Sequence, residues 1–541
     1  MANNNQKQDF GVLYGQKTTE DALLIYSSYN DAQASPQLGD FIVLTPRDEY
    51  GIKFLARVEA EIYDEDPIFR NQDKTLIAVH YARIAERELS ERDKQKMFSY
   101  TYKVKILGTF EGDGKNFTTA VRKLPVVSYH ARHLTPREIS NILNRTNENG
   151  TKIGYLCIGE TYSDEQKILF DVKKLREKRT MVFAQSGFGK TNLMKILIYN
   201  TISDNSYGKL IFDLNGEYYL NGIKTYGLGS IDEQVIKDNL VVYSDKKISD
   251  SRFNIKGDVR LNMHKHLSIG DILNFGTGFS EVMKSFLYYL EDEQVENFIA
   301  NLNHYASKPE ELHKKYPDFW KEKDASASKT ISAIKKRLSF LTEESKGLHL
   351  NTSTLVEDVF SFLKQGKTVI IDLSLRDNQE ATIISNIFMR KLFENNKKEF
   401  TSNKTENVIN TVIVVEEAQN VLSDEFVRSN ANPFVRVAKE GRKFGLGLVA
   451  ITQRPSAISE EIRSQAENFF VLHMGNSKDI KALVESNINY DGVISKFIQS
   501  ETIPGNLYMV SANQSFVLPV RVIEFEKLVE NKIYKDLQIS K

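Results

Sequence analysis

The feature that most constrains this chain is a glycine-bearing loop between an apolar run and an apolar helical segment. The loop, residues 184–191, reads AQSGFGKT, follows the apolar run 180–183 and precedes the apolar segment 193–198. The order strand, loop, helix is that of a phosphate-binding loop, in which backbone N–H groups at a helix N-terminus face phosphate oxygens. The sequence therefore predicts an α/β nucleotide-binding core that binds ATP.

The residues of this loop divide the binding task. In the pattern G-x-x-x-x-G-K-[ST], the lysine reaches the β- and γ-phosphates and the hydroxyl residue binds Mg²⁺. Ala184 stands where the pattern has its first glycine. With ATP and Mg²⁺ as cofactors, the predicted nucleotide-binding residues are Ser186, Gly187, Phe188, Gly189, Lys190, Thr191 and Asn192.

Length and composition bound the class of protein. A chain of 541 residues is too long for one core, so several domains are expected. Basic and acidic residues number 72 each, so any DNA contact must come from a local basic surface. Cys157 is the only cysteine in the sequence, which excludes a disulfide framework and favours a cytoplasmic location. No uncharged apolar run reaches membrane-spanning length, so no membrane segment is expected.

The first part of the chain has the pattern of short antiparallel strands. Apolar and polar residues alternate over 54–62 and 100–107, and turn residues separate many of the runs. This pattern predicts a small N-terminal antiparallel β-barrel or sandwich, which we assign as a barrel over residues 1–135. Two segments within it are less regular: 75–79 is a short apolar run, and 81–97 is charge-rich and favours a helix or a solvated excursion.

A different pattern begins near residue 135. The tetrapeptide Thr135-Pro136-Arg137-Glu138 combines a capping hydroxyl, a proline at the first helical position and a glutamate three residues on, which predicts a helix start. From 136 to 541 apolar strands alternate with helices, which predicts a RecA-like core with a largely parallel sheet. A helical subdomain is expected as an insertion over about 225–360. The predicted strands are 181–184, 209–212, 368–371, 411–415, 447–451 and 469–473.

An acidic pair follows one of these strands. The run 411–415 ends in Glu416 and Glu417. Adjacent strand residues point to opposite sides, so one carboxylate can support Mg²⁺ and the other can polarise the attacking water. The alternative is that both acids merely cap a helix that begins at Ala418.

Three other motifs lie at strand ends. Arg442 precedes a strand and can act in trans on the γ-phosphate of a neighbouring subunit, or it is a solvated basic residue of a turn. Gln453 follows the same strand at the edge where parallel sheets bind ligands, so it can orient water or sense the γ-phosphate, unless it is a turn amide. Asp213 and Glu217 follow the second strand and either assist Mg²⁺, hold an intersubunit contact or form a plain turn.

Taken in order, these motifs resemble the HerA family of hexameric DNA-translocating ATPases. The resemblance covers most of the chain and rests on the phosphate loop, the signature 213–218, the acidic pair, and the motifs 441–443 and 452–455. It implies a RecA-like P-loop core, a homo-hexameric ring and double-stranded DNA through its centre. It also implies roles: phosphate and metal binding by Lys190 and Thr191, metal support by Glu416, and catalysis by Glu417 as base, Gln453 as sensor and Arg442 as finger.

The resemblance also bears on partners. HerA-like ATPases work with a nuclease or, in anti-phage systems, with an effector such as a sirtuin-like NADase that docks on the barrel. The sequence has no nuclease or NADase motif, so the effector is expected to be a separate chain. Ala184 for glycine and Glu416 for aspartate depart from the family pattern, and these departures favour an alternative hypothesis of a nucleotide-binding ring scaffold with little translocation. A third hypothesis is a conjugation or secretion ATPase of related core.

Overall fold

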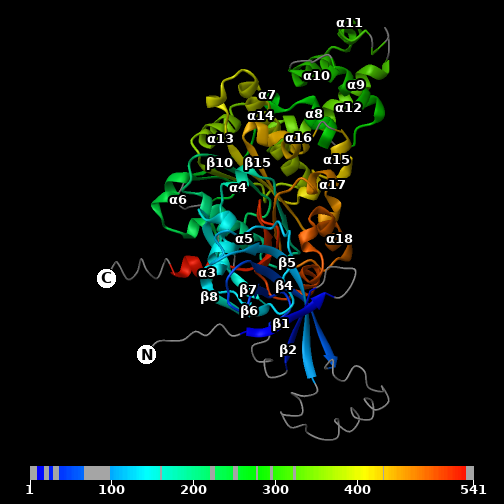
Figure 1. Ribbon diagram of the computed structural model, residues 1–541. Coiled ribbons are helices and arrows are strands. Elements are labelled where there is room, and N and C mark those ends of the chain that lie inside the picture. The colour runs from blue at the N-terminus through cyan, green and yellow to red at the C-terminus, as the bar shows by residue number, and fades with distance from the viewer. Residues whose placement is uncertain are drawn as a thin grey trace, which may run out of the picture. The chain divides into compact units, whose positions relative to one another are not determined.

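Figure 1 shows the computed structural model of the chain. The contacts within the chain divide it into two compact units. Unit 1 comprises Met1–Asp171 and Phe469–Ile523, and unit 2 comprises Val172–Asn468 and Glu524–Lys541. Each unit is therefore built from two separate stretches of the chain. The predicted boundary at residue 135 between a barrel and an ATPase core stays a prediction. The structure describes residues 9–16, 23–28, 36–65, 98–158, 161–219, 226–247, 254–275, 278–292, 297–317, 319–320, 325–429 and 432–531.

The N-terminal strands of unit 1 form an antiparallel sheet, as predicted. Their pairing order is β1-β2-β5-β4-β3-β6, and β6 pairs with β1, which closes the sheet. Phe54, Ala56 and Val58 alternate along β4 and are buried in the core of this sheet. The segments 75–79 and 81–97 lie outside the described residues. The strands are β1 (Asp9–Gln16), β2 (Leu23–Ser28), β3 (Phe41–Thr45), β4 (Lys53–Glu65), β5 (Phe98–Phe110) and β6 (His130–His133).

The helix start predicted after this sheet is confirmed. Thr135 caps α3 (Pro136–Glu138): its hydroxyl accepts from the Glu138 backbone N–H at 3.3 Å, and the Glu138 carboxylate accepts from the Thr135 N–H at 2.9 Å. Arg132 of β6 donates two hydrogen bonds of 2.8 and 2.9 Å to the same carboxylate. Burial opposes ionisation, but the hydrogen bonds from Arg132 and Thr135 lower the pKa of Glu138. A buried ion pair thus fixes the exit from the N-terminal sheet.

A second antiparallel sheet in unit 1 joins the two stretches of its chain. The strand order is β16-β17-β18-β7-β8, so β18 from near the C-terminus pairs with β7 from the first third. This pairing explains why the unit is discontinuous in sequence. Its elements are β7 (Thr151–Ile158), β8 (Thr161–Phe170), β16 (Asn468–Val471), β17 (Asn506–Val510), β18 (Leu518–Val522), α18 (Ser477–Ser486) and α19 (Val493–Ser500).

Unit 2 is built on a parallel sheet with the order β12-β11-β13-β10-β14-β15-β9. Every residue of β9, β10, β13, β14 and β15 is buried. Because alternate side chains point to opposite faces, both faces must be covered, as in α/β folds. The uninterrupted apolar runs predicted these five strands correctly. Their bounds are β9 (Thr180–Phe183), β10 (Gly208–Asp213), β13 (Thr368–Asp372), β14 (Thr411–Val415) and β15 (Leu446–Thr452).

The helices of unit 2 include a group of α9, α10 and α12 that lie together in Figure 1. Among the residues that the structure describes, none of the helices combines the length and hydropathy needed to cross a bilayer. The helices are α4 (Lys174–Glu177), α5 (Lys190–Thr201), α6 (Gln234–Asn239), α7 (Met263–His266), α8 (Ile269–Phe275), α9 (Glu281–Asp292), α10 (Phe298–Ser307), α11 (Leu312–Lys315), α12 (Ala325–Thr342), α13 (Leu355–Lys364), α14 (Asn378–Thr401), α15 (Asp424–Ser429), α16 (Pro433–Glu440) and α17 (Glu460–Arg463).

The segment expected to be a helical insertion, about 225–360, is not helical throughout. Ile331, Ile334, Leu338 and Leu341 are buried along one face of α12, as their spacing predicted. However, β11 (Leu240–Tyr243) and β12 (Asn254–Lys256) lie in the same segment and extend the parallel sheet beyond β13. The apolar run of β11 was the signal that could have revealed this extension.

A buried lysine lies on β10. The Lys209 ammonium donates to the backbone oxygen of Gly366 at 3.1 Å and to that of Asp204. Burial lowers the pKa of Lys209 from its ordinary value of 10.5 to about 8. The folded chain therefore holds fewer protons at this site than the unfolded chain between about pH 8 and 10.5.

This shift predicts a pH-dependent difference between the wild type and Lys209→Gln. Wild-type stability relative to the variant should be constant below pH 8 and rise between about pH 8 and 10.5, by at most about 3 kcal/mol. Melting temperatures of both proteins measured in steps across this range will show the rise. A difference that stays flat up to pH 10.5 would contradict a lowered pKa for Lys209.

Candidate active site

The phosphate-binding loop has the predicted surroundings. It links β9, which ends at Phe183, to α5, which begins at Lys190. Gly187 and Gly189 have φ of 84° and 97°, in the left-handed region that favours glycine. The residue that precedes α5 is Gly189, which has no side chain to cap the helix, and helix N-termini are favourable sites for anions.

Three neighbouring strands bring the predicted catalytic residues to this loop. β15 pairs in parallel with β14 on one side and with β9 on the other. The carboxyl ends of the three strands therefore share one edge of the sheet, which is where parallel sheets bind ligands. Glu417 follows β14, Gln453 follows β15, and the loop follows β9.

Glu417 is the centre of this group. Its Oε1 lies 3.6 Å from the Lys190 ammonium and accepts a hydrogen bond of 3.1 Å from Gln453 Nε2. Ser186 donates to Gln453 Oε1 at 2.9 Å, so the loop and both strand ends are linked. Glu417 has φ of 47°, a left-handed conformation that is uncommon for a glutamate and clusters at functional sites. The structure thus brings Ser186, Lys190, Glu417 and Gln453 together.

Glu416 contacts a different set of groups. The Tyr218 hydroxyl donates to Glu416 Oε1 at 2.6 Å, and the Asn215 amide lies 3.5 Å from Oε2. Burial raises the pKa of Glu416 to about 7; the Tyr218 hydrogen bond opposes this shift and the charge of Asp213 adds to it. The two adjacent carboxylates therefore have separate surroundings, and they do not simply cap the same helix turn.

The signature 213–218 forms a tight turn that supplies these groups. Asp213 accepts from the backbone N–H groups of Gly216 at 2.7 Å and Tyr218 at 3.0 Å. The turn places Glu217 against the loop, where Thr191 donates to its carboxylate at 2.8 Å. Asp213 is thus a turn former, whereas Glu217 and Tyr218 extend the site.

These residues fit a magnesium ion. Mg²⁺ prefers oxygen ligands from carboxylates, hydroxyls and water. Thr191, Glu217 and Glu416 supply such oxygens, and burial together with nearby carboxylates makes the ionised form of Glu416 costly. A bound divalent cation would relieve that cost. The sequence left open whether Glu217 assists Mg²⁺, holds an intersubunit contact or forms a plain turn, and its contact with Thr191 favours the first of these.

Two predicted site residues are placed differently from the rest. Arg442 precedes β15 whereas Gln453 follows it, and the seven residues of this strand separate the two sheet edges by roughly 20 Å. Arg442 is 57% exposed, and its guanidinium lies 3.7 Å from Glu467. The Asn192 side chain accepts from the backbone N–H of Phe525 at 2.7 Å. Nucleotide binding by Asn192 stays a prediction.

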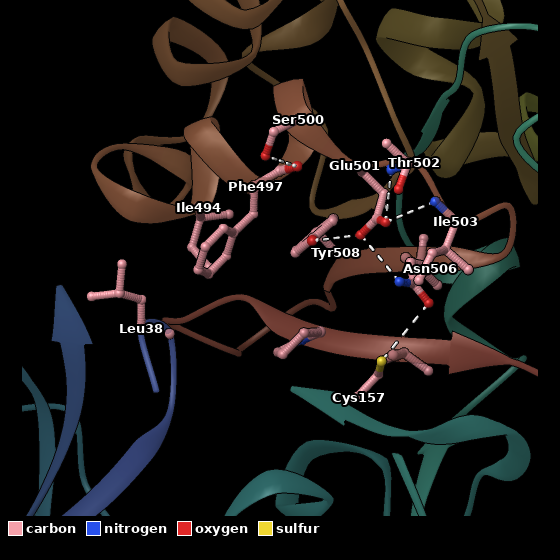
Figure 2. A pocket seen from close by; sticks show the side chains of 14 residues that line it. Leu38, Cys157, Ile494, Phe497, Ser500, Glu501, Thr502, Ile503, Asn506 and Tyr508 are labelled. Atoms are coloured by element: carbon pink, nitrogen blue, oxygen red, sulfur yellow. Dashed lines mark hydrogen bonds between the residues drawn. The ribbon is translucent and has the colours of Figure 1, made fainter. Parts of the chain in front are cut away.

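A cavity of about 170 Å³ lies elsewhere, within unit 1 (Figure 2). Its polar side centres on Glu501, which accepts from the backbone N–H of Ile503, the Asn506 amide and the Tyr508 hydroxyl. Burial raises the pKa of the Cys157 thiol to about 11, which disfavours the reactive thiolate. None of the predicted site residues lines this cavity.

The Tyr218 contact yields a stability prediction. Tyr218→Phe removes the hydrogen bond to a buried carboxylate and should destabilise the protein by about 1–3 kcal/mol, seen as a lower melting temperature. Tyr199→Phe is the matched control, because its hydroxyl also binds a carboxylate, at 3.1 Å from Glu233, but at a partly exposed position. Equal melting temperatures for wild type and Tyr218→Phe would show that this contact does not stabilise the fold.

Two family models match parts of this chain. Residues 153–392 match the family model described as helicase HerA, central domain, and residues 328–480 match that of zonular occludens toxin (Zot). The DNA double-strand break repair helicase HerA of Sulfurisphaera tokodaii is 26% identical over 367 residues, which are 68% of this chain and 67% of that protein. The protein of the same name from Saccharolobus solfataricus is 23% identical over 496 residues, 91% of this chain and 87% of that protein.

Among solved structures, VirB4 of Thermoanaerobacter pseudethanolicus aligns with a TM-score of 0.42 at 14% identity, over 70% of this chain and 98% of that chain. The parallel sheet, the phosphate-binding loop and the acidic pair define a P-loop ATPase. Within that class, residues 153–392 match the central domain of the helicase HerA, and the chain is similar to HerA helicases at 23–26% identity.

Proposed function

We propose that this ATPase is a homo-hexameric motor that hydrolyses Mg²⁺-ATP and moves double-stranded DNA. The observation that carries the proposal is the convergence of Ser186, Lys190, Glu417 and Gln453 at one sheet edge beside the phosphate-binding loop. Relatives that cover most of the chain are DNA repair helicases by name, which supports DNA as the polymer acted on.

We assign each residue a task in hydrolysis. Lys190 leaves Glu417 and binds the β- and γ-phosphates of the incoming nucleotide. Gln453 orients a water molecule, and Glu417 accepts its proton as the water oxygen bonds to the γ-phosphorus and the bond to ADP breaks. Mg²⁺, when bound, neutralises phosphate charge, and Thr191, Glu416 and Glu217 are the residues that would hold it.

Arg442 is proposed to act on the active site of a neighbouring subunit. Its place at the opposite sheet edge, roughly 20 Å from Gln453 along β15, separates it from the γ-phosphate of its own subunit. Its exposed guanidinium is available to a second copy of the chain. A ring in which each subunit completes the next site would couple hydrolysis around the assembly.

A separate effector is the proposed partner of the N-terminal sheet. We expect a nuclease or a sirtuin-like NADase, in anti-phage defence or DNA processing. Exposed apolar side chains support a docking surface here: Leu124, Val126 and Val127 lie in the loop before β6, and Val12 lies on β1, which pairs with β6. Exposed apolar groups gathered in this way are typical of protein interfaces.

The alternative is a ring scaffold that binds nucleotide to assemble and activate the effector with little translocation. Ala184 in place of glycine and Glu416 in place of aspartate favour it, because both substitutions lie at the nucleotide site. Turnover separates the two functions, since a scaffold requires binding but little hydrolysis.

The motor makes a clear prediction for Lys190→Ala and Glu417→Gln. Both variants should lose at least about 10²-fold in ATP turnover, because one removes the phosphate ligand and the other the base. Lys190→Ala should also lose nucleotide binding, whereas Glu417→Gln should retain it. Phosphate release measured with and without duplex DNA is the assay, with stimulation by DNA expected for the wild type. Equal slow turnover in all three proteins would reject the motor and favour the scaffold.

Arg442→Ala should bind ATP normally and lose hydrolysis by about 10³-fold or more. Lys443→Ala, which removes the neighbouring exposed cation, is the matched control and should retain activity. Mixing Arg442→Ala with Lys190→Ala subunits should restore turnover, because an intact arginine then faces an intact site. Wild-type turnover by Arg442→Ala alone would reject the assignment.

A further inference from the structure

Gln419 lies between Glu417 and the end of β15, the strand that precedes Gln453. It lies in the short turn Ala418–Asn420, directly after Glu417. Its amide Nε2 donates to Glu417 Oε2 at 2.6 Å, and its Oε1 accepts from the Thr452 hydroxyl at 2.6 Å. Thr452 is the last residue of β15 and is fully buried.

The chemistry of the partners fixes the direction of these bonds. An ionised carboxylate only accepts, so the Gln419 amide must turn its NH₂ group to Glu417 and its oxygen to Thr452. The Thr452 hydroxyl accepts from the backbone N–H of Arg454 at 3.0 Å, which leaves its proton for Gln419. From Thr452 to the Glu417 carboxylate, every hydrogen bond therefore pairs one donor with one acceptor.

The two oxygens of Glu417 have different partners. Oε1 contacts Lys190, which the proposed mechanism moves to the phosphates, and Gln453, which it assigns to the attacking water. Oε2 contacts Gln419, which has no assigned contact with nucleotide. When Lys190 binds the phosphates and Gln453 binds the attacking water, Gln419 is the group that still holds the Glu417 carboxylate.

We propose that Gln419 is a positioning residue for ATP hydrolysis, which holds Glu417 at the attacking water through the Thr452–Gln419–Glu417 hydrogen-bond chain. The backbone of Glu417 is left-handed, so its side chain leaves the strand end in an unusual direction that needs a fixed partner. The same hydrogen bonds connect Glu417 to Thr452, the residue before Gln453. The proposed base and the proposed sensor are therefore both held at the end of β15. The inference rests on the proposed role of Glu417 as base.

The test uses full-length protein with Gln419→Leu, Thr452→Val and the double variant. Gln419→Leu keeps the size of the side chain and removes both hydrogen bonds. The kcat for ATP should fall about 10- to 100-fold while KM stays within about 2-fold, since positioning acts on the chemical step. Gln419→His, which can keep an N–H donor, should recover part of the loss.

Coupling between the variants separates positioning from packing. Thr452 acts through Gln419, so the double variant should be no slower than Gln419→Leu alone. Gln365→Leu is the control, because Gln365 is an exposed glutamine just before β13 whose amide hydrogen-bonds to Ser361. Its kcat, KM and melting temperature should match those of the wild type.

The outcomes distinguish this inference from the proposed function. If Glu417→Gln abolishes turnover while Gln419→Leu has a wild-type kcat, the positioning role is rejected and the motor stands. A rise in KM without a fall in kcat, or multiplied losses in the double variant, would also reject it. If Glu417→Gln retains full turnover, the base assignment fails and the role of Gln419 fails with it.

Discussion

The contact between the Lys190 ammonium and the Glu417 carboxylate depends on the pairing of three parallel strands. β15 lies between β14 and β9, so residues that are far apart in sequence meet at one edge. The same edge carries the loop glycines, the turn after β10 and the buried Glu416. Parallel pairing of these strands is therefore the constraint from which the chemistry of the protein follows, because it sets which side chains are within reach of one triphosphate.

That arrangement also explains why adjacent acids differ. Glu416 is buried against Tyr218, whereas Glu417 leaves the strand in a left-handed conformation and meets Lys190. One backbone step thus places one carboxylate in a buried position and the other beside the phosphate-binding loop. A single residue could not supply both environments.

Much of this could be read from the sequence, because local patterns carry it. Continuous apolar runs gave the buried strands, and the capping signal at Thr135 gave the start of α3. The strand β11 was missed because its partner β13 is distant in sequence, and β12 is only three residues long and pairs with β11. Partners such as Tyr218 and Phe525 were missed for the same reason: no spacing in the chain tells which distant group a side chain will meet.

The pairing of β18 with β7 has a consequence for how the protein is made. The first strands leave the ribosome long before Leu518–Val522 is synthesised, at about 5–20 residues per second. Until then β7 presents an unpaired edge, which is a site for wrong pairing with other chains. Unit 1 can therefore complete its fold only after β18 has been synthesised. A protein shortened at its C-terminal end would keep the phosphate-binding loop but expose the unpaired edge of β7, which favours aggregation.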